Sequence, residues 1–363
     1  METAICSDRL SYRNIPSFND NCFDIIRLLA AFIVMFSHSF KWFGFEKPIF
    51  MLFLTDGQVG VIIFYALSGY LTYASYDRIV KNKGNVWLFW YKRIVRIYPV
   101  YLLVSAFMVI IDAARGLNIL TSTYIIRRFL NIMTFGLIYV PDGISNGVIW
   151  SLRVEVVFYV IVPLIYAILN NKRLVWWIVT VVALWQFNVW DTQFLGFLAK
   201  FPVINILSRI DNPAMFMYEF IIGSMFYCHR EKLVGIFSRK GIVISLTILF
   251  TVWTFLYDKC GIVPKFGEMH NPVYGIVIPF ITIGLGYAFG RFRLNFDISY
   301  GLFLVHMLVI YELLRFEKGG VMWLFASWII IVALSFVLHY AFEKPVKAIT
   351  SKMEKKLEKK INA

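Results

Sequence analysis

Residues 321–342 read VMWLFASWIIIVALSFVLHYAF, a run without Asp, Glu, Lys or Arg. A helix of this length rises about 33 Å, which is enough to cross the hydrocarbon core of a bilayer. Toward the N-terminus, comparable apolar runs recur along nearly the whole chain, with short polar loops between them. Of the 363 residues, 60% are hydrophobic, 18% are aromatic and only 16% are charged. The sequence therefore predicts an integral membrane protein.

The predicted fold is an all-α, polytopic membrane helix bundle of about ten transmembrane helices. Apolar length and turn residues place these spans near residues 22–41, 57–77, 95–112, 150–170, 174–190, 203–228, 241–257, 271–290, 298–315 and 321–342. Residues 119–139 carry Arg127 and Arg128 in their middle, opposite an apolar face. We expect an interfacial or re-entrant helix there rather than an eleventh span.

The basic residues follow the positive-inside rule. The formal net charge is +14, and Lys and Arg concentrate in alternate segments, at residues 9–13, 78–96, 172–173, 230–240, 291–293 and 344–360. Both termini are therefore expected in the cytoplasm, and nucleic acid is not an expected partner. Only Cys260 of the four cysteines falls on the outer side, so no disulfide is expected.

Three regions are expected along the chain. Residues 1–21 are polar, lack the apolar core of a cleavable signal peptide and form a cytoplasmic arm. Residues 22–345 form the transmembrane domain. Residues 346–363 form a basic, helical cytoplasmic tail, which either stays solvated or meets anionic lipid headgroups. No inverted repeat of the transporter kind is visible.

Ionisable side chains inside predicted spans are costly and mark functional sites. Five stand out, namely Arg27, His38, Glu155, Glu219 and His306. Arg27 and His38 are eleven residues apart, so on a helix they face within about 20° of each other with about 16 Å of rise between them. They would line one wall at two depths. The structural alternative is a snorkelling arginine and a hydrogen-bonded core histidine.

Three further features lie near these side chains. Glu155 is expected at a depth similar to His38, where it would orient the imidazole or pair with Arg153. Arg93 and Arg96 share one face at a cytoplasmic helix start, which suits a phosphate clamp as well as simple membrane anchoring. His306 lies about midway along its span, where it would line a pathway or bridge two helices. No spacing of His, Cys and carboxylates reads as a metal site.

Six motifs in this order resemble the acyltransferase-3 family of bacterial membrane O-acyltransferases, which modify lipopolysaccharide, peptidoglycan and exopolysaccharide. The family's first-helix Arg and His are similar to Arg27 and His38. Residues 57–71 resemble the family's glycine and Ser-Gly-Phe pattern, and residues 93–101 resemble its Arg-x-x-Arg-Ile-x-Pro-x-Tyr. Residues 150–155 are similar to its Trp-Ser-Leu-x-x-Glu, residues 300–306 to its Tyr-x-x-Tyr-Leu-x-His, and residues 343–345 to its Glu-x-Pro. Tyr70 and Phe303 depart from the family's Phe and Tyr. The extra outer hydrolase-like domain of many relatives is not expected.

The resemblance implies a donor and a set of residue roles. Acyl-CoA, with acetyl-CoA expected before succinyl-CoA, would enter from the cytoplasm, its phosphates held by Arg93, Arg96 and Arg27. His38 would act as a general base or carry the acyl group covalently. Glu155 is the second expected catalytic residue, and the expected supporting residues are Ser68, Trp150, Ser151, Tyr300 and His306.

The resemblance also implies an acceptor and a location. The acceptor would be a hydroxyl of a cell-surface glycan or its lipid-linked precursor, and the protein would be a multi-pass protein of the bacterial inner membrane. No permanently bound cofactor is expected. A transporter or flippase of a lipid-linked saccharide is the alternative, because the same buried charges would bind substrate or relay protons. The oligomeric state is not predicted.

Overall fold

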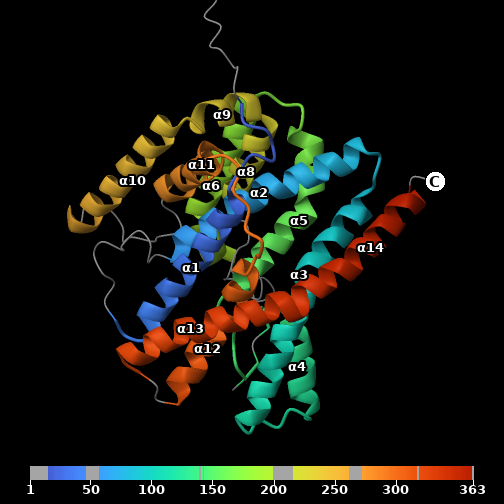
Figure 1. Ribbon diagram of the computed structural model, residues 1–363, viewed down its shortest axis with the longest axis vertical. Helices are drawn as coiled ribbons and strands as arrows, with labels where there is room; N and C mark the ends of the chain where they lie inside the picture. The colour runs from blue at the N-terminus through green and yellow to red at the C-terminus, as the bar shows by residue number, and fades with distance from the viewer. Residues whose placement is uncertain are drawn as a thin grey trace, which may run out of the picture.

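The computed structural model describes residues 15–45, 57–138, 140–141, 143–198, 216–260, 272–316 and 319–361. Throughout these ranges the regular structure is helical, without a strand (Figure 1). The helices are α1 (Phe23–Trp42), α2 (Gly57–Lys81), α3 (Val86–Ala114), α4 (Ser122–Met133), α5 (Ile149–Leu169), α6 (Leu174–Leu198), α8 (Met217–Cys228), α9 (Arg230–Phe237), α10 (Lys240–Cys260), α11 (Pro272–Ala288), α12 (Ser299–Arg315), α13 (Val321–Leu338), the π-helical η3 (His339–Glu343) and α14 (Lys344–Ile361).

Helix α2 forms the centre of the bundle and packs against α1, α5, α8 and α11. Its glycines allow close backbone approach, as small residues do between membrane helices. A Cβ on Gly69 would lie 2.1 Å from the carbonyl oxygen of Phe220 in α8, and one on Gly60 would lie 2.6 Å from that of Ala30 in α1. Gly60 and Gly69 therefore set how closely α2 approaches α1 and α8.

The described helices support membrane spanning but not a total of ten spans. Five of them are long and apolar enough to cross a bilayer, or six if α9 and α10, bent by 70°, count as one span. Helices α6 and α11 contain shorter apolar stretches, and α12 has 17 residues. The predicted span 203–228 falls largely on 199–215, outside the described residues. The cytoplasmic placement of the termini stays a prediction.

Two boundaries differ from those expected. Helix α3 begins at Val86 rather than near residue 95, because the Asn85 side chain caps it by accepting from the Leu88 amide at 3.0 Å. The basic segment that contains Arg93 and Arg96 is therefore helical and belongs to α3. At the other end, α13 continues through η3 into α14, which packs along α3 (Figure 1).

The stretch expected at an interface is the 12-residue helix α4, too short to span a bilayer. Its apolar side chains are exposed on the molecule, namely Ile125, Ile126, Phe129, Leu130 and Met133. On the other side, Arg128 forms a buried ion pair with Asp112 of α3, and Tyr124 donates to the same carboxylate at 2.6 Å. The ion pair fixes the direction of the apolar face, and a position in the membrane interface remains the expectation for α4.

Candidate active site

A cavity of about 790 Å³ lies among α1, α2, α3, α5, α12 and α14. Seven of the ten predicted site residues line it, namely Arg27, Ser68, Arg93, Arg96, Ser151, Glu155 and Tyr300. The other three, His38, Trp150 and His306, are not in its lining. The size falls within the range of about 300–1,000 Å³ that is usual for small-molecule sites. Residues far apart in the sequence thus meet at one site.

The lining carries an excess of positive charge. Its basic side chains are Arg27, Lys92, Arg93, Arg96, Arg293, Lys344 and Lys347, and its acidic side chains are Asp24, Glu155, Asp297, Glu343 and Glu354. Seven basic and five acidic groups leave a net charge of +2. A cavity of this charge favours an anionic ligand.

Arg93 and Arg96, both on α3, are candidate anion-binding groups of the cavity. Arg93 is buried, and its guanidinium lies 5.5 Å from the centre of the Phe89 ring and 5.4 Å from that of Tyr159. Neither arginine forms an ion pair with a carboxylate in the part of the chain that the structure describes. The Arg93 guanidinium, which lies against two rings and is in no such ion pair, suits bidentate binding of phosphate, and Arg96 lies one helical turn away on α3.

Arg27 differs, because two carboxylates already balance it. It pairs with Asp24 at 2.6 Å on its own helix and with Asp297, just before α12, at 3.4 Å. Burial raises the pKa of Asp297, but the charge of Arg27, the hydrogen bond from Ser299 and the charge of Arg96 outweigh it and hold the pKa below its ordinary value. Arg27 therefore joins α1 to α12, in addition to lining the cavity.

Glu155 is oriented by hydroxyl groups. The Ser68 hydroxyl donates to its Oε1 at 2.7 Å, and the Tyr159 hydroxyl donates to the same oxygen. The sequence suggested that Glu155 orients His38, but the ring found beside His38 is that of His306. Tyr159 was missed by the sequence analysis, although its position one helical turn after Glu155 was a usable signal.

His38 and His306 form a stacked pair. The distance from His38 Nδ1 to His306 Nε2 is 2.9 Å, the ring centres are 5.1 Å apart, and the planes differ by 15°. His306 is fully buried, and its Nδ1 lies 3.1 Å from the carbonyl oxygen of Leu302. A carbonyl oxygen only accepts, so His306 Nδ1 carries the proton and His306 Nε2 accepts from His38 Nδ1. His38 Nε2 then carries the lone pair that a general base or a nucleophile needs.

An aromatic wall lies where the cavity meets this pair. Phe303 lines the cavity, and its ring centre is 6.0 Å from that of His306 and 5.6 Å from that of Phe64, which also lines the cavity. The histidine pair therefore adjoins the cavity through Phe303.

The remaining predicted residues serve mainly as supports. The Tyr300 hydroxyl donates to the carbonyl of Ile97 at 3.0 Å, which fixes α12 to α3 beside Arg96. Ser151 donates at 2.9 Å to the carbonyl of Val148, the residue just before its own helix.

Two other side chains lie apart from the cavity. Trp150 packs against Phe216, with the two ring centres 5.3 Å apart. Glu219 is buried in α8 and is not in the cavity lining.

Helix α14 covers most of the region for which the sequence analysis expected a basic, helical tail, either solvated or in contact with anionic lipid headgroups. The predicted helix is confirmed, but its side chains form part of the cavity wall, namely Lys344, Val346, Lys347, Thr350 and Glu354. Neither alternative included this contribution to the cavity wall, which arises because α14 packs along α3.

Comparisons with known proteins identify the family of the chain. Nodulation protein 10 of Rhizobium leguminosarum bv. viciae is 28% identical over 366 residues, which cover 93% of this chain and 96% of the relative. An O-acetyl transferase of Shigella phage Sf6 is 32% identical over 167 residues, which cover 42% of this chain and 48% of that protein. No solved structure matches the chain. Residues 20–343 match the acyltransferase domain of the acyltransferase-3 family, and the chain therefore belongs to this family of membrane-embedded acyltransferases.

Proposed function

We propose that this protein transfers an acyl group, in the first instance acetyl, from cytoplasmic acyl-CoA to a hydroxyl of a cell-surface glycan or its lipid-linked precursor in the bacterial inner membrane. The observation that carries the proposal is the cavity that joins Arg93 and Arg96 to a wall against the His38–His306 pair. Family membership supports acyl transfer over transport of a lipid-linked saccharide. The phage relative named as an O-acetyl transferase supports an acetyl group on oxygen.

The phosphates of the donor would lie at the basic end of the cavity. Arg93 and Arg96 supply guanidinium forks, and the ammonium groups of Lys92, Lys344 and Lys347 add positive charge. Arg27 contributes less, since Asp24 and Asp297 already take its charge. From this end the pantetheine arm would extend along the apolar lining toward Phe64 and Phe303. This direction brings the thioester close to the histidine pair.

The transfer step needs one base and returns one proton. The acceptor hydroxyl oxygen attacks the thioester carbonyl carbon while His38 Nε2 takes the hydroxyl proton. The C–O bond forms, the C–S bond breaks, and the thiolate of coenzyme A leaves with the proton that His38 returns. His306 holds His38 in the tautomer that this step requires. A covalent acyl-His38 intermediate uses the same lone pair and is the second route.

The test is acyl-CoA turnover by the protein in liposomes, supplied with envelope glycan from the producing bacterium. Wild type is compared with His38→Ala, using acetyl-CoA and succinyl-CoA as donors. Loss of a general base is expected to lower kcat by about 10²-fold to 10⁴-fold. Ser39→Ala is the matched control, because the Ser39 hydroxyl donates to the Met35 carbonyl of its own helix at 2.8 Å. Full activity in His38→Ala, or no binding of either donor to the wild type, would contradict the proposal.

A further inference from the structure

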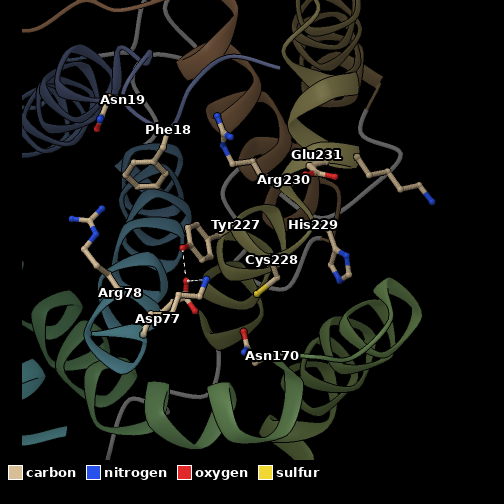
Figure 2. Close-up of a pocket in the computed structure, with 12 residues that line it drawn as sticks. Phe18, Asn19, Asp77, Arg78, Asn170, Tyr227, Cys228, His229, Arg230 and Glu231 are labelled. Atoms are coloured by element: carbon tan, nitrogen blue, oxygen red, sulfur yellow. Dashed lines mark hydrogen bonds and ion pairs between the residues drawn. The ribbon is translucent and has the colours of Figure 1, made fainter. Parts of the chain in front are cut away.

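A second cavity, of about 830 Å³, lies at the ends of α2, α5 and α8 and the start of α9. Figure 2 shows its lining, which shares no residue with the candidate active site. Arg78, Lys81, Arg230 and Lys232 contribute four positive charges, and Asp77 and Glu231 contribute two negative ones, so the net charge is +2. Its volume is that of a small-molecule site. Acyl transfer as described above does not use this cavity.

The buried carboxylate of this cavity is already satisfied. Asp77 accepts from Lys81 Nζ at 2.7 Å, from the Tyr227 hydroxyl at 2.7 Å and from the Tyr166 hydroxyl at 2.9 Å. The ammonium group of Lys81 therefore balances the one buried negative charge. Because three donors occupy the carboxylate, it is a poor site for an added cation, and Glu231 is the one acidic group of the lining beside the remaining basic groups.

Those remaining groups are Arg78, Arg230 and Lys232. Within the described residues none of them forms an ion pair with a carboxylate. The Arg78 guanidinium lies 5.8 Å from the centre of the Phe18 ring, and that of Arg230 lies 5.3 Å from the Tyr287 ring. In the view of Figure 2, Arg78 and Arg230 flank Phe18. Both guanidinium groups thus lie against rings, and Arg230 Nη2 also donates to the Pro16 carbonyl oxygen.

Neutral polar groups complete the lining. Asn19 and Asn170 bring side-chain amides, which donate readily to phosphate oxygens. Helix α9 also begins here at Arg230, and no side chain caps its first amide groups. Hydrogen-bond donors thus accompany the positive charge, and this combination suits a phosphate group.

The position of the cavity indicates the source of the phosphate. It lies at an end of the bundle where basic residues gather, beside Lys172 and Arg173 at the turn between α5 and α6. Three residues after Arg173, the Trp176 side chain is 55% exposed on an apolar helix surface. Tryptophan beside basic residues marks the level of lipid headgroups. Basic pockets between helices at the cytoplasmic side are characteristic sites for anionic lipid headgroups.

We propose that this second cavity binds the phosphate group of an anionic phospholipid through Arg78, Arg230 and Lys232. The headgroup would sit between α2 and α9, while its acyl chains run along the exposed apolar surface of neighbouring helices. This site is independent of the acyl donor and stands whether or not the chain uses acyl-CoA.

Lipid retention measured by native mass spectrometry tests the proposal. The full chain, in phosphatidylcholine nanodiscs, is titrated with short-chain phosphatidylglycerol. We expect Arg78→Gln with Lys232→Gln to weaken retention about tenfold, the result of losing about 1.4 kcal/mol of charge-assisted binding. Both side chains are exposed, so the fold is expected to persist. Arg173→Gln removes an exposed charge from the same end outside the lining and is expected to match the wild type.

Four outcomes decide whether the site exists and which ligand it takes. Exchange of the two groups, Arg78→Lys with Lys232→Arg, keeps the charge and is expected to restore retention. Equal retention of phosphatidylglycerol and phosphatidylcholine, or equal losses in the double variant and in Arg173→Gln, would overturn the site. Pyrophosphate provides the soluble comparison: binding of pyrophosphate that the double variant loses, without any preference for phosphatidylglycerol, would overturn the lipid as the source of the phosphate.

Discussion

Replacing His306 by leucine tests the histidine pair most directly. The change removes the ring that accepts from His38 Nδ1 at 2.9 Å, but it keeps an apolar side chain of similar size in a fully buried position. A neutral hydrogen bond of this kind is worth about 0.5–1.5 kcal/mol, which corresponds to about 2-fold to 13-fold in rate if only orientation is lost. Because the tautomer of His38 is also released, the expected fall in kcat is tenfold or more.

The location of His306 predicts which kinetic constant changes. His306 does not line the cavity, so the KM for acyl-CoA is expected to stay within about twofold while kcat falls. His306→Gln offers a matched comparison, because its amide oxygen can accept from His38 Nδ1 in place of the ring nitrogen. Activity of this variant is expected to lie close to the wild type.

Turnover of acyl-CoA in liposomes gives both constants, and thermal unfolding in detergent checks that each variant is folded. Leaving His38 Nδ1 without a partner costs about 1–3 kcal/mol if the ring does not rotate, so a modest loss of stability is expected for His306→Leu. Full kcat in His306→Leu, or an effect confined to KM, would refute the assigned tautomer and the role of the pair.

Three further predictions concern the donor, the packing and pH. Arg96→Gln is expected to raise the Kd for acyl-CoA about tenfold to a hundredfold, because it removes a charged hydrogen-bond donor worth about 1.5–3 kcal/mol; titration calorimetry would reveal an unchanged Kd if the reasoning is wrong. Gly69→Ala is expected to destabilise the bundle, since its Cβ would lie 2.1 Å from the Phe220 carbonyl oxygen; a thermal midpoint equal to the wild type would contradict this packing. The pKa of Asp297 in the folded protein lies below its ordinary value. The stability that its pair with Arg27 contributes is therefore present above the pKa of the unfolded chain and is lost as the pH falls through the pKa of the folded protein. Asp297→Asn should remove this part of the acid dependence when the free energy of unfolding is measured at falling pH.

Buried charge was the feature of the sequence that predicted the site best. Polar groups inside apolar runs are costly, so the search for them led to Arg27 and Glu155, and the cavity now includes both. The pairing of His38 with His306 could not be predicted, because 268 residues separate the two and spacing alone does not define which helices touch. The fold shows the same division. All-helical structure followed from composition, whereas the number of spans depends on helix lengths that tertiary packing decides.

The contribution of α14 escaped prediction for a different reason. Residues 344–361 are rich in lysine, and such a pattern reads as a solvated helix when no partner surface is known. In the structure η3 carries the chain from α13 into α14, and this leads α14 along α3 and over the cavity. Lysines 344 and 347 then face the same space as Arg93. Their charge contributes to the cavity only because α14 packs against α3, and the local sequence does not predict this contact.

Two side-chain contacts between α1 and the α12 region explain the spacing of Arg27 and His38. Arg27 pairs with Asp297, just before α12, and His38 pairs with His306 within it. Eleven residues on one helix and nine residues on the other rise by about 16 Å and 13 Å, so the two elements run side by side in the same direction. This agrees with the predicted topology, in which the first and ninth spans both run outward from the cytoplasm. A shift of either helix along the other by one turn would break both the ion pair and the histidine contact. The ion pair of Arg27 with Asp297 therefore also sets the depth at which His38 contacts His306.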